Sequence, residues 1–292
     1  MSKSASPKIL ITGATGTIGN ELTSYLSSQG HSFRAMVRSR NNSSELAKLS
    51  GAEVVDGDFN DTLSLTKALE GIDRAFLLTN SSELAENQQC DFVEAARKMG
   101  VRHIIKLSQW AASVDSPVRF LRYHAVVENL IRDSGMEYTF LRPNLFMQGL
   151  LGFRETILTQ GRFYGAAGDS KVSMVDIRDI ARAAACALTE PGHEGKIYDL
   201  TGPQALSHYE MAEELTIALG FEVKFVDIPS QALKDMLLGV GFPEWQAEGL
   251  VEDYAHYKRG EAAAVTSGVL DATGAAAASF DQFARDYAQV FF

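Results

Sequence analysis

Cysteine is scarce in this chain of 292 residues, which contains two, Cys90 and Cys186. They are far apart, and neither belongs to a CxxC pattern or a Cys/His cluster. The sequence therefore indicates no zinc site, no redox pair and no other bound metal. Both cysteines lie in segments with helical periodicity, so we expect both to be buried by helix packing.

Positive charge is also in short supply. The 27 lysines and arginines are outnumbered by 37 acidic residues, which gives a net charge of −10. No dense basic run offers a surface for phosphate backbones, so we expect no nucleic-acid partner. No stretch approaches the ~20 apolar residues that span a bilayer, and the polar first residues contain no apolar segment of signal-peptide length. We expect a cytoplasmic protein that does not bind membranes.

Apolar strands and amphipathic helices alternate through most of the chain. The pattern predicts strands at 8–12, 33–37, 53–55, 75–78, 103–107, 138–141 and 197–200, and helices at 18–26, 46–49, 63–69, 86–99, 120–134 and 177–188. Parallel strands need crossover connections, and helices fill these gaps. The sequence therefore predicts an α/β fold with a doubly wound parallel sheet of the Rossmann type.

Beyond Pro143 strands and helices alternate less regularly. We expect a helix at 145–159, a glycine-rich loop at 161–169, a strand at 223–226 and helices at 209–219, 230–238, 245–257 and 280–290. Residues 1–150 and about 172–202 are assigned to the NAD(P)-binding Rossmann domain. Residues of about 151–171 and 203–292 are assigned to a smaller, mostly helical C-terminal domain that binds substrate. The tract 260–278 has only weak periodicity.

Three glycines follow the first predicted strand in a GxxGxxG arrangement. Gly13 permits a tight turn, Gly16 allows the backbone to approach a pyrophosphate, and Gly19 lets the helix pack closely on the sheet. The helix N-terminus then faces the anion with free N–H groups and a positive dipole end. An unliganded turn is the alternative. The predicted phosphate loop comprises Gly13, Thr15, Gly16, Thr17, Ile18 and Gly19.

The end of the second strand normally decides which nucleotide binds. A carboxylate there would bind the ribose 2′-hydroxyl and repel a 2′-phosphate, yet no Asp or Glu occurs between Glu21 and Glu45. That interval instead holds Arg34, Arg38 and Arg40. Because Arg38 directly follows the strand, we predict that it binds the 2′-phosphate of NADP(H). The alternative is that these arginines are solvated surface charges.

Ligands of such sheets bind at the carboxyl ends of the strands. Asp58 and Phe59 are placed to border an adenine, although an acid and an aromatic residue also occur in loops by chance. On the nicotinamide side, Lys106 either bonds the ribose or is a surface cation at a strand end. The remaining candidates for the nicotinamide side are Leu78, Thr79, Asn80, Pro143, Asn144 and Phe146.

Several motifs together resemble the NmrA-like family of atypical short-chain dehydrogenases/reductases. They are the glycine loop, Val37-Arg-Ser39, Gly57-Asp-Phe59 and the run Tyr138-Thr-Phe-Leu-Arg-Pro-Asn144. Within that family the chain is most similar to NAD(P)H-dependent quinone, azo-dye and triphenylmethane-dye reductases. Their His-x-x-x-(Glu/Lys) pattern is present as His124 and Glu128. The resemblance covers nearly the whole chain.

The usual catalytic pattern of the superfamily, Tyr-x-x-x-Lys, is incomplete. Ser108 and Tyr123 are present, but Val127 stands where the lysine would lower the pKa of the tyrosine. A tyrosine with a pKa near 10 is a poor acid at neutral pH, which argues against ketone reduction by the usual route. An electron-poor acceptor needs no such acid. We nominate Lys106, His124 and Tyr123 as catalytic; His124 would orient substrate or relay a proton near pH 7, unless it is an ordinary helix residue.

These features predict an NADPH-dependent oxidoreductase that transfers hydride to a quinone-like or other electron-poor conjugated small molecule, without flavin. A redox sensor that binds NAD(P) and regulates a partner protein without turnover is the alternative, and a reductase of imines or double bonds is a third reading. A homodimer is compatible with the sequence. Residues that would stack on a flat acceptor, unless they are plain core, are Trp110, Phe146, Met147, Phe153, Phe163 and Tyr164.

Overall fold

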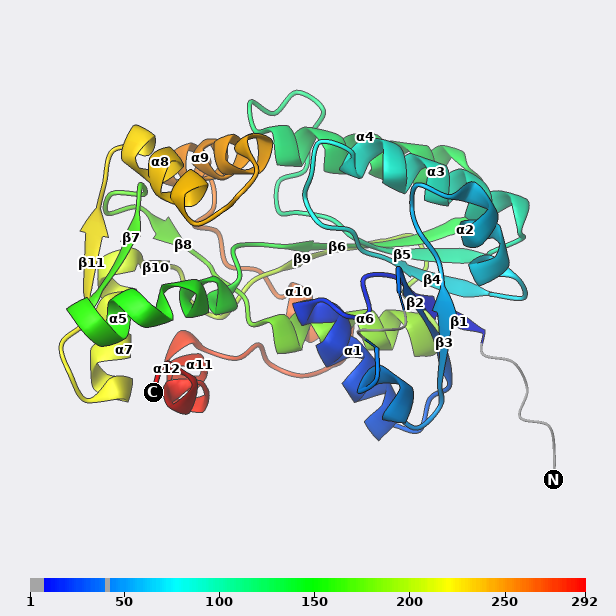
Figure 1. The fold of residues 1–292 in the computed structure, drawn as a ribbon, viewed down its shortest axis with the longest axis horizontal. Helices are drawn as coiled ribbons and strands as arrows, with labels where there is room; N and C mark the ends of the chain where they lie inside the picture. Colours follow the sequence, from blue (N-terminus) through cyan, green and yellow to red (C-terminus); the bar gives the residue numbers. More distant parts are fainter. Residues whose placement is uncertain (1–7, 40–42) are drawn as a thin grey trace. The chain divides into compact units, whose positions relative to one another are not determined.

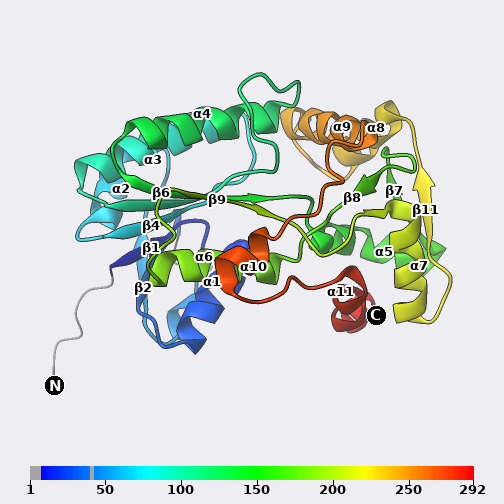
Figure 2. The same cartoon turned by 180° about the vertical axis from the view of Figure 1, so that it is seen from behind.

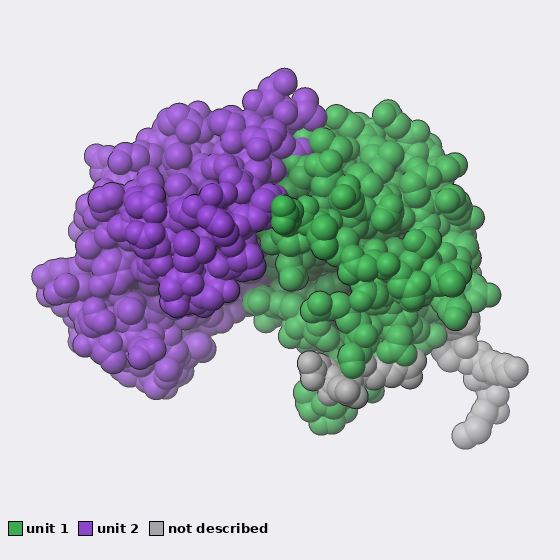
Figure 3. All heavy atoms as spheres, turned by 45° about the horizontal axis from the view of Figure 1, so that its top comes forward, with its two compact units in different colours: residues 1–108, 123–142, 180–198 green, residues 109–122, 143–179, 199–292 purple. Residues whose placement is uncertain are grey.

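A computed structural model describes residues 8–39 and 43–292. The chain forms two compact units, each assembled from several segments (Figure 3). Of the described residues, unit 1 comprises 8–39, 43–108, 123–142 and 180–198, and unit 2 comprises 109–122, 143–179 and 199–292. No helix in the described ranges has the length and apolar character needed to cross a membrane.

A seven-stranded sheet forms the framework of the Rossmann fold. Its strand order is β3-β2-β1-β4-β5-β6-β9, and β1 to β6 pair in parallel. The strands are β1 (Ile9–Ile11), β2 (Phe33–Val37), β3 (Ala52–Asp56), β4 (Arg74–Leu77), β5 (His103–Leu107), β6 (Glu137–Pro143) and β9 (Lys196–Leu200). The strand order reverses between β1 and β4, which is where such sheets bind ligands. The predicted doubly wound fold is confirmed.

Helices cover both faces of this sheet. Figures 1 and 2 show α2, α3 and α4 along one face and α1 and α6 along the other. Their bounds are α1 (Thr17–Ser28), α2 (Thr62–Leu69), α3 (Ala85–Lys98), α4 (Arg119–Asp133) and α6 (Ile177–Thr189). The predicted helix at 46–49 is a short 3-10 helix, Leu46–Lys48. Cys186 is buried in α6 as expected, whereas Cys90 in α3 is partly exposed.

The turn between β1 and α1 depends on its glycines. Gly13 has a φ of +62°, a backbone conformation that L side chains rarely adopt. A Cβ atom on Gly19 would lie 2.1 Å from the carbonyl oxygen of Gly13. Only glycine therefore lets α1 approach the end of β1 this closely, and the helix then buries Ile18, Leu22 and Leu26.

Unit 2 has its own apolar core and more strand than expected. It contains two small sheets, one of β10 (Leu206–Ser207) with β8 (Lys171–Val172) and one of β11 (Lys224–Asp227) with β7 (Arg162–Gly165). The predicted loop at 161–169 is thus wrong for residues 162–165, because β7 pairs with β11 from far along the chain. The predicted helix at 145–159 is a 3-10 helix, Met147–Phe153, followed by α5 (Arg154–Gln160).

The C-terminal part of unit 2 is helical. Its helices are α7 (His208–Leu219), α8 (Ser230–Gly239), α9 (Glu244–Lys258), α10 (Gly268–Thr273), α11 (Phe280–Asp286) and α12 (Ala288–Phe291). The single helix predicted at 280–290 is divided in two. Helix α9 is joined to the segment 109–122 by an ion pair between Arg119 and Glu252, 2.7 Å apart.

The compact units differ in their boundaries from the predicted domains. Residues 109–122 and 143–150 fall in unit 2, although they were assigned to the Rossmann domain. Compactness does not reveal what either unit binds, so the assignment of a substrate-binding domain stays a prediction.

Candidate cofactor site and active site

The glycine loop leaves the start of α1 open to an anion. Gly16 is the N-cap residue, and no side chain caps the free N–H groups of the first turn. Thr15, Gly16 and Thr17 are exposed, whereas Ile18 and Gly19 are buried. An exposed helix N-terminus without a side-chain cap fits the pyrophosphate of a dinucleotide.

The end of β4 is fastened to this loop. The hydroxyl of Thr12 donates to the carbonyl oxygens of Phe76 and Leu78 and accepts from the N–H of Leu78. A Cβ atom on Gly13 would lie 2.9 Å from Cγ of Leu78, so the two residues are in close contact. Thr79 accepts a hydrogen bond from Gln89, and Asn80 is exposed.

The three arginines of the predicted nucleotide-selecting segment differ in environment. Arg38 is exposed immediately after β2, where a 2′-phosphate ligand is expected. Arg34 is buried instead, because its guanidinium donates to the carbonyl oxygens of Ala68 and Glu70 and pairs with Glu53. Arg34 is therefore neither a phosphate ligand nor a solvated charge. Arg40 lies outside the described residues.

Asp58 and Phe59 follow β3 as expected. Oδ1 of Asp58 accepts hydrogen bonds from the backbone N–H and the side-chain amide of Asn60. The ring of Phe59 packs against Phe92, with ring centroids 5.7 Å apart. Asp58 thus stabilises its own turn, and its role at the adenine stays a prediction.

Lys106 and His124 form a buried pair at the carboxyl end of β5. Nζ of Lys106 lies 2.7 Å from Nδ1 of His124 and donates to the carbonyl oxygen of Leu107. Lys106 is 0% exposed, so its interpretation as a surface cation is wrong. An ammonium group can only donate, so while Lys106 is protonated Nδ1 of His124 accepts and the ring proton is on Nε2.

Burial keeps both groups from carrying charge easily. Desolvation lowers the pKa of Lys106 to about 7, although Glu128 acts in the opposite direction. Desolvation and the neighbouring lysine hold the pKa of His124 well below its usual value. The lowered pKa favours a neutral His124 near pH 7, and its role in orienting substrate or relaying a proton stays a prediction. It can serve as a neutral N–H donor.

Tyr123 lies next to this pair. Its ring packs on His124 with centroids 4.2 Å apart, and its hydroxyl is 3.2 Å from Oγ of Ser81. Val127 has an uncharged side chain and is buried in the core of unit 1. This position therefore supplies no cation to Tyr123. Ser81 belongs to the polar run that follows β4, but no motif in the sequence marks it.

Glu128 is the centre of a buried charge cluster on α4. It accepts from the hydroxyl of Ser108 at 2.6 Å and forms ion pairs with Arg142 at 2.6 Å and Arg132 at 3.2 Å. The His-x-x-x-Glu pattern therefore has two parts. His124 pairs with Lys106, while Glu128 joins α4 to β6 and to the residue after β5.

The three candidates at the end of β6 and just after it differ in what they can offer a ligand. Both N–H groups of the Asn144 side chain are used, by Ser173 and by the carbonyl oxygen of Ala262. Its Oδ1 accepts from the N–H of Leu145. Pro143 is buried, and Phe146 is partly exposed. Phe146 is thus the residue of this group whose side chain is most accessible.

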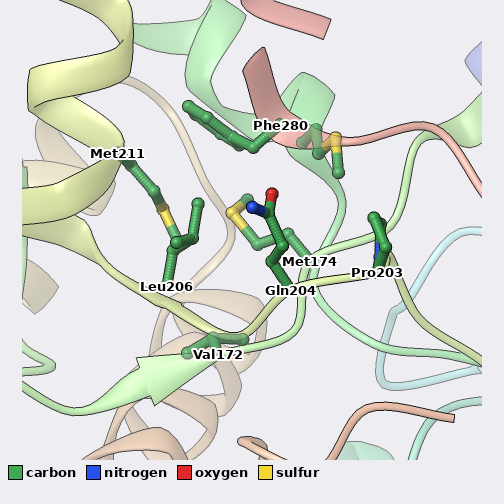
Figure 4. A pocket seen from close by; sticks show the side chains of 8 residues that line it. Val172, Met174, Pro203, Gln204, Leu206, Met211 and Phe280 are labelled. Atoms are coloured by element: carbon green, nitrogen blue, oxygen red, sulfur yellow. The ribbon is translucent and has the colours of Figure 1, made fainter. Parts of the chain in front are cut away.

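Some of the residues proposed to stack on a flat acceptor belong to the core of unit 2. Met147 and Phe163 are buried there, and Phe153 packs on Phe163. Met147, Met174 and Met211 line a small apolar pocket (Figure 4). Its interior has room for about one water molecule. It is too small for an aromatic ring.

Known proteins resemble this chain along nearly all of its length. The NmrA-like family model matches residues 5–281. The NAD(P)H azoreductase of Xenophilus azovorans is 37% identical, over 97% of this chain and 99% of that protein. Two crystal structures are each 30% identical. An NADPH-dependent quinone oxidoreductase from Escherichia coli, complexed with NADPH, has a TM-score of 0.86 and covers 95% of this chain and 99% of its own. Citrobacter sp. triphenylmethane reductase, complexed with NADP(H), has a TM-score of 0.84 and covers 96% and 99%.

The parallel sheet, its switch point and the open glycine loop define a dinucleotide-binding protein of the Rossmann class. The chain belongs to the NmrA-like family. The resemblance seen in the sequence motifs is thereby confirmed.

Proposed function

We propose that this chain is a reductase that uses NADPH to reduce quinone-like or other electron-poor conjugated compounds. The observation that carries the proposal is the buried Lys106–His124 pair beside Tyr123, in a helix where Val127 takes the place of the usual lysine. A neutral N–H donor suits an acceptor that needs stabilisation of negative charge rather than an acid. The reductases similar to this chain support the same reaction class.

Three residues of unit 1 have separate roles in the proposed reaction. NADPH, when bound, supplies the hydride. Nε2–H of His124 donates to the acceptor oxygen on which negative charge develops, and Lys106 is a positioning residue that keeps the proton of His124 on Nε2. Tyr123 packs against the imidazole ring in a tilted arrangement, and its hydroxyl contacts Ser81. The proton that completes the reduction comes from water.

We assign the cofactor to the glycine loop at the start of α1 and to residues at the carboxyl ends of the strands. The pyrophosphate binds the glycine loop, Arg38 binds the 2′-phosphate, and Asp58 with Phe59 borders the adenine. The nicotinamide side is assigned to Leu78, Thr79, Asn80, Lys106, Pro143, Asn144 and Phe146. Because Lys106 and Asn144 already use their N–H groups within the protein, we expect them to act by shaping the site.

The function is tested by oxidation of NADPH by the purified protein with a panel of quinones, azo dyes and triphenylmethane dyes. Acceptor-dependent oxidation supports the reductase. Tight binding of NADPH without oxidation on any acceptor contradicts it and favours the sensor that regulates a partner protein.

Arg38→Ala is expected to reduce the preference for NADPH. Loss of a bidentate guanidinium–phosphate contact costs ~2 kcal/mol, so kcat/KM for NADPH should fall more than tenfold while that for NADH changes little. Steady-state kinetics with both cofactors measures the effect. Arg97→Ala is the matched control, since Arg97 is a surface residue of α3 paired with Glu94. An unchanged cofactor ratio in the Arg38 variant would show that another residue selects the nucleotide.

The partner is assigned as a small aromatic or conjugated molecule, and the protein is assigned to the cytosol. The net charge of −10 supports neither nucleic acid nor an anionic membrane surface as a partner. A homodimer is compatible with these assignments, and light scattering of the purified protein would measure the oligomeric state.

A further inference from the structure

An aspartate that the proposed reaction does not use is buried in unit 2. Asp253, on α9, is 4% exposed. Both of its carboxylate oxygens lie 3.1 Å from one nitrogen atom, Nε2 of Gln109. A buried carboxylate is normally paired with a cation, because removing a charge from water is costly. No lysine, arginine or histidine among the described residues forms an ion pair with Asp253.

Apart from Gln109, the groups close to Asp253 do not stabilise its negative charge. Glu252, its neighbour on α9, is also acidic, and the side chains of Tyr254 and Tyr257 are the other titratable groups close to it. Gln109 is neutral. Burial is the main reason why the pKa of Asp253 is raised to about 7, with Glu252 adding to the effect and Gln109 opposing it. Asp253 therefore changes its protonation state near neutrality.

Gln109 stands where residues of this fold meet ligands. It is the second residue after β5, at the carboxyl end of the strand that carries Lys106. Its Nε2 faces Asp253, while Oε1 has no hydrogen-bond partner within residues 8–39 and 43–292. Nε2 of Gln109 is thus bound to Asp253, and Oε1 can accept a hydrogen bond from a ligand.

We propose that Asp253 is a positioning residue whose protonation decides whether Gln109 offers a hydrogen-bond donor or an acceptor to the substrate. The inference rests on the proposed reductase function. Ionised Asp253 can only accept, so it holds Nε2 and leaves the carbonyl oxygen of Gln109 outward. When Asp253 is protonated, it can donate to Oε1 of Gln109 after the side-chain amide of Gln109 has rotated. The N–H groups of Gln109 then face the substrate.

The two orientations suit different ligands. A quinone presents carbonyl oxygens, which gain negative charge as hydride arrives and are stabilised by N–H donors. The reduced product presents hydroxyl groups, which donate to a carbonyl oxygen. Protonation of Asp253 therefore favours reduction of the quinone, and its ionisation removes the donor.

The first test is the pH dependence of kcat/KM for a quinone. The protonated fraction of a group with a pKa of about 7 falls about tenfold between pH 6 and pH 8. We expect the ratio of kcat/KM at these two pH values to be about tenfold larger in the wild type than in Asp253→Asn. The pKa of Lys106 is also about 7, but Lys106 is present in both proteins. Comparing the pH ratios of the two proteins therefore cancels the contribution of Lys106 and leaves that of Asp253. Asp235→Asn, on the exposed side of α8, should keep the wild-type ratio. Equal ratios in the wild type and Asp253→Asn would overturn the proposal.

The second test does not depend on turnover. The side-chain amide resonances of Gln109, assigned by their loss in Gln109→Leu, should shift with a midpoint near pH 7 in the wild type and stay constant in Asp253→Asn. Amide resonances that do not titrate in the wild type, or that still titrate in the variant, would overturn the proposal. If no quinone or dye is reduced, the proposed function fails, and this measurement still decides whether Asp253 controls Gln109.

Discussion

Lys106→Met is expected to give a protein that is more stable at neutral pH and has lost most of its reductase activity. Methionine has a similar length and fills the same buried space without a charge to desolvate. A shift of the lysine pKa from 10.5 to about 7 corresponds to a destabilisation of roughly 4 kcal/mol at pH 7. Loss of the contact with Nδ1 frees His124 to change its tautomer. We expect kcat/KM to fall about 100-fold.

The pH dependence of this stability difference has a definite sign. The unfolded chain protonates Lys106 below about pH 10, whereas the folded protein does so only below about 7. The destabilisation therefore develops as pH falls from about 10 to 7 and is constant below 7. Urea unfolding at pH 7 and pH 10 should show a large advantage of the variant at the lower pH and a small one at the higher.

Lys98→Met is the control for this experiment, because Lys98 is an exposed residue near the end of α3. It should change the free energy of unfolding by less than ~0.5 kcal/mol. If Lys106→Met were less stable than the wild type at pH 7, the burial of Lys106 would not carry the cost that we assign to it.

Glu128→Gln is expected to destabilise the protein by about 3 kcal/mol. The carboxylate is 0% exposed and neutralises Arg142 and Arg132, whose side chains are 19% and 32% exposed. Glutamine keeps the shape but removes the negative charge that faces these two guanidinium groups. The hydrogen bond from Ser108 survives, because the amide oxygen still accepts.

A double-mutant cycle with Arg142→Met separates the ion pair from other effects. The double variant should lose less than the sum of the two single losses, since both partners are then absent. Glu94→Gln is the control, because the Glu94–Arg97 pair lies at the surface, where solvent screens the attraction between the charges. Additive losses in the cycle would show that Glu128 and Arg142 do not stabilise each other.

The sheet, its order of elements and the phosphate loop could be predicted because their signals are local. Gly13, Gly16 and Gly19 lie within one turn, and each helix that follows a strand has its own periodicity. The environment of Lys106 could not be predicted in this way. In a parallel sheet covered on both faces, every residue of β5 is buried, so no alternation marks the position of the lysine.

Features that depend on distant segments were missed. Arg162 to Gly165 look like part of a glycine-rich loop until they pair with the strand Lys224–Asp227. Asp253 follows Glu252 in a helix with charged residues, which suggests an exposed surface. Its burial depends on contacts with distant parts of the chain, such as Gln109, which lies against it. Such non-local contacts leave no periodic trace in the sequence.

The ion pair between Arg119 and Glu252 also bears on how the protein is made. The two residues are 133 positions apart, so the ribosome adds Glu252 long after Arg119. At 5–20 residues per second the delay is on the order of ten seconds. During that time residues 109–122 have no α9 to bind, and unit 2 can be completed only when the last part of the chain emerges. A pause in translation beyond residue 199 would lengthen the time for which the nascent chain is incompletely folded. Chaperones are most important at this stage.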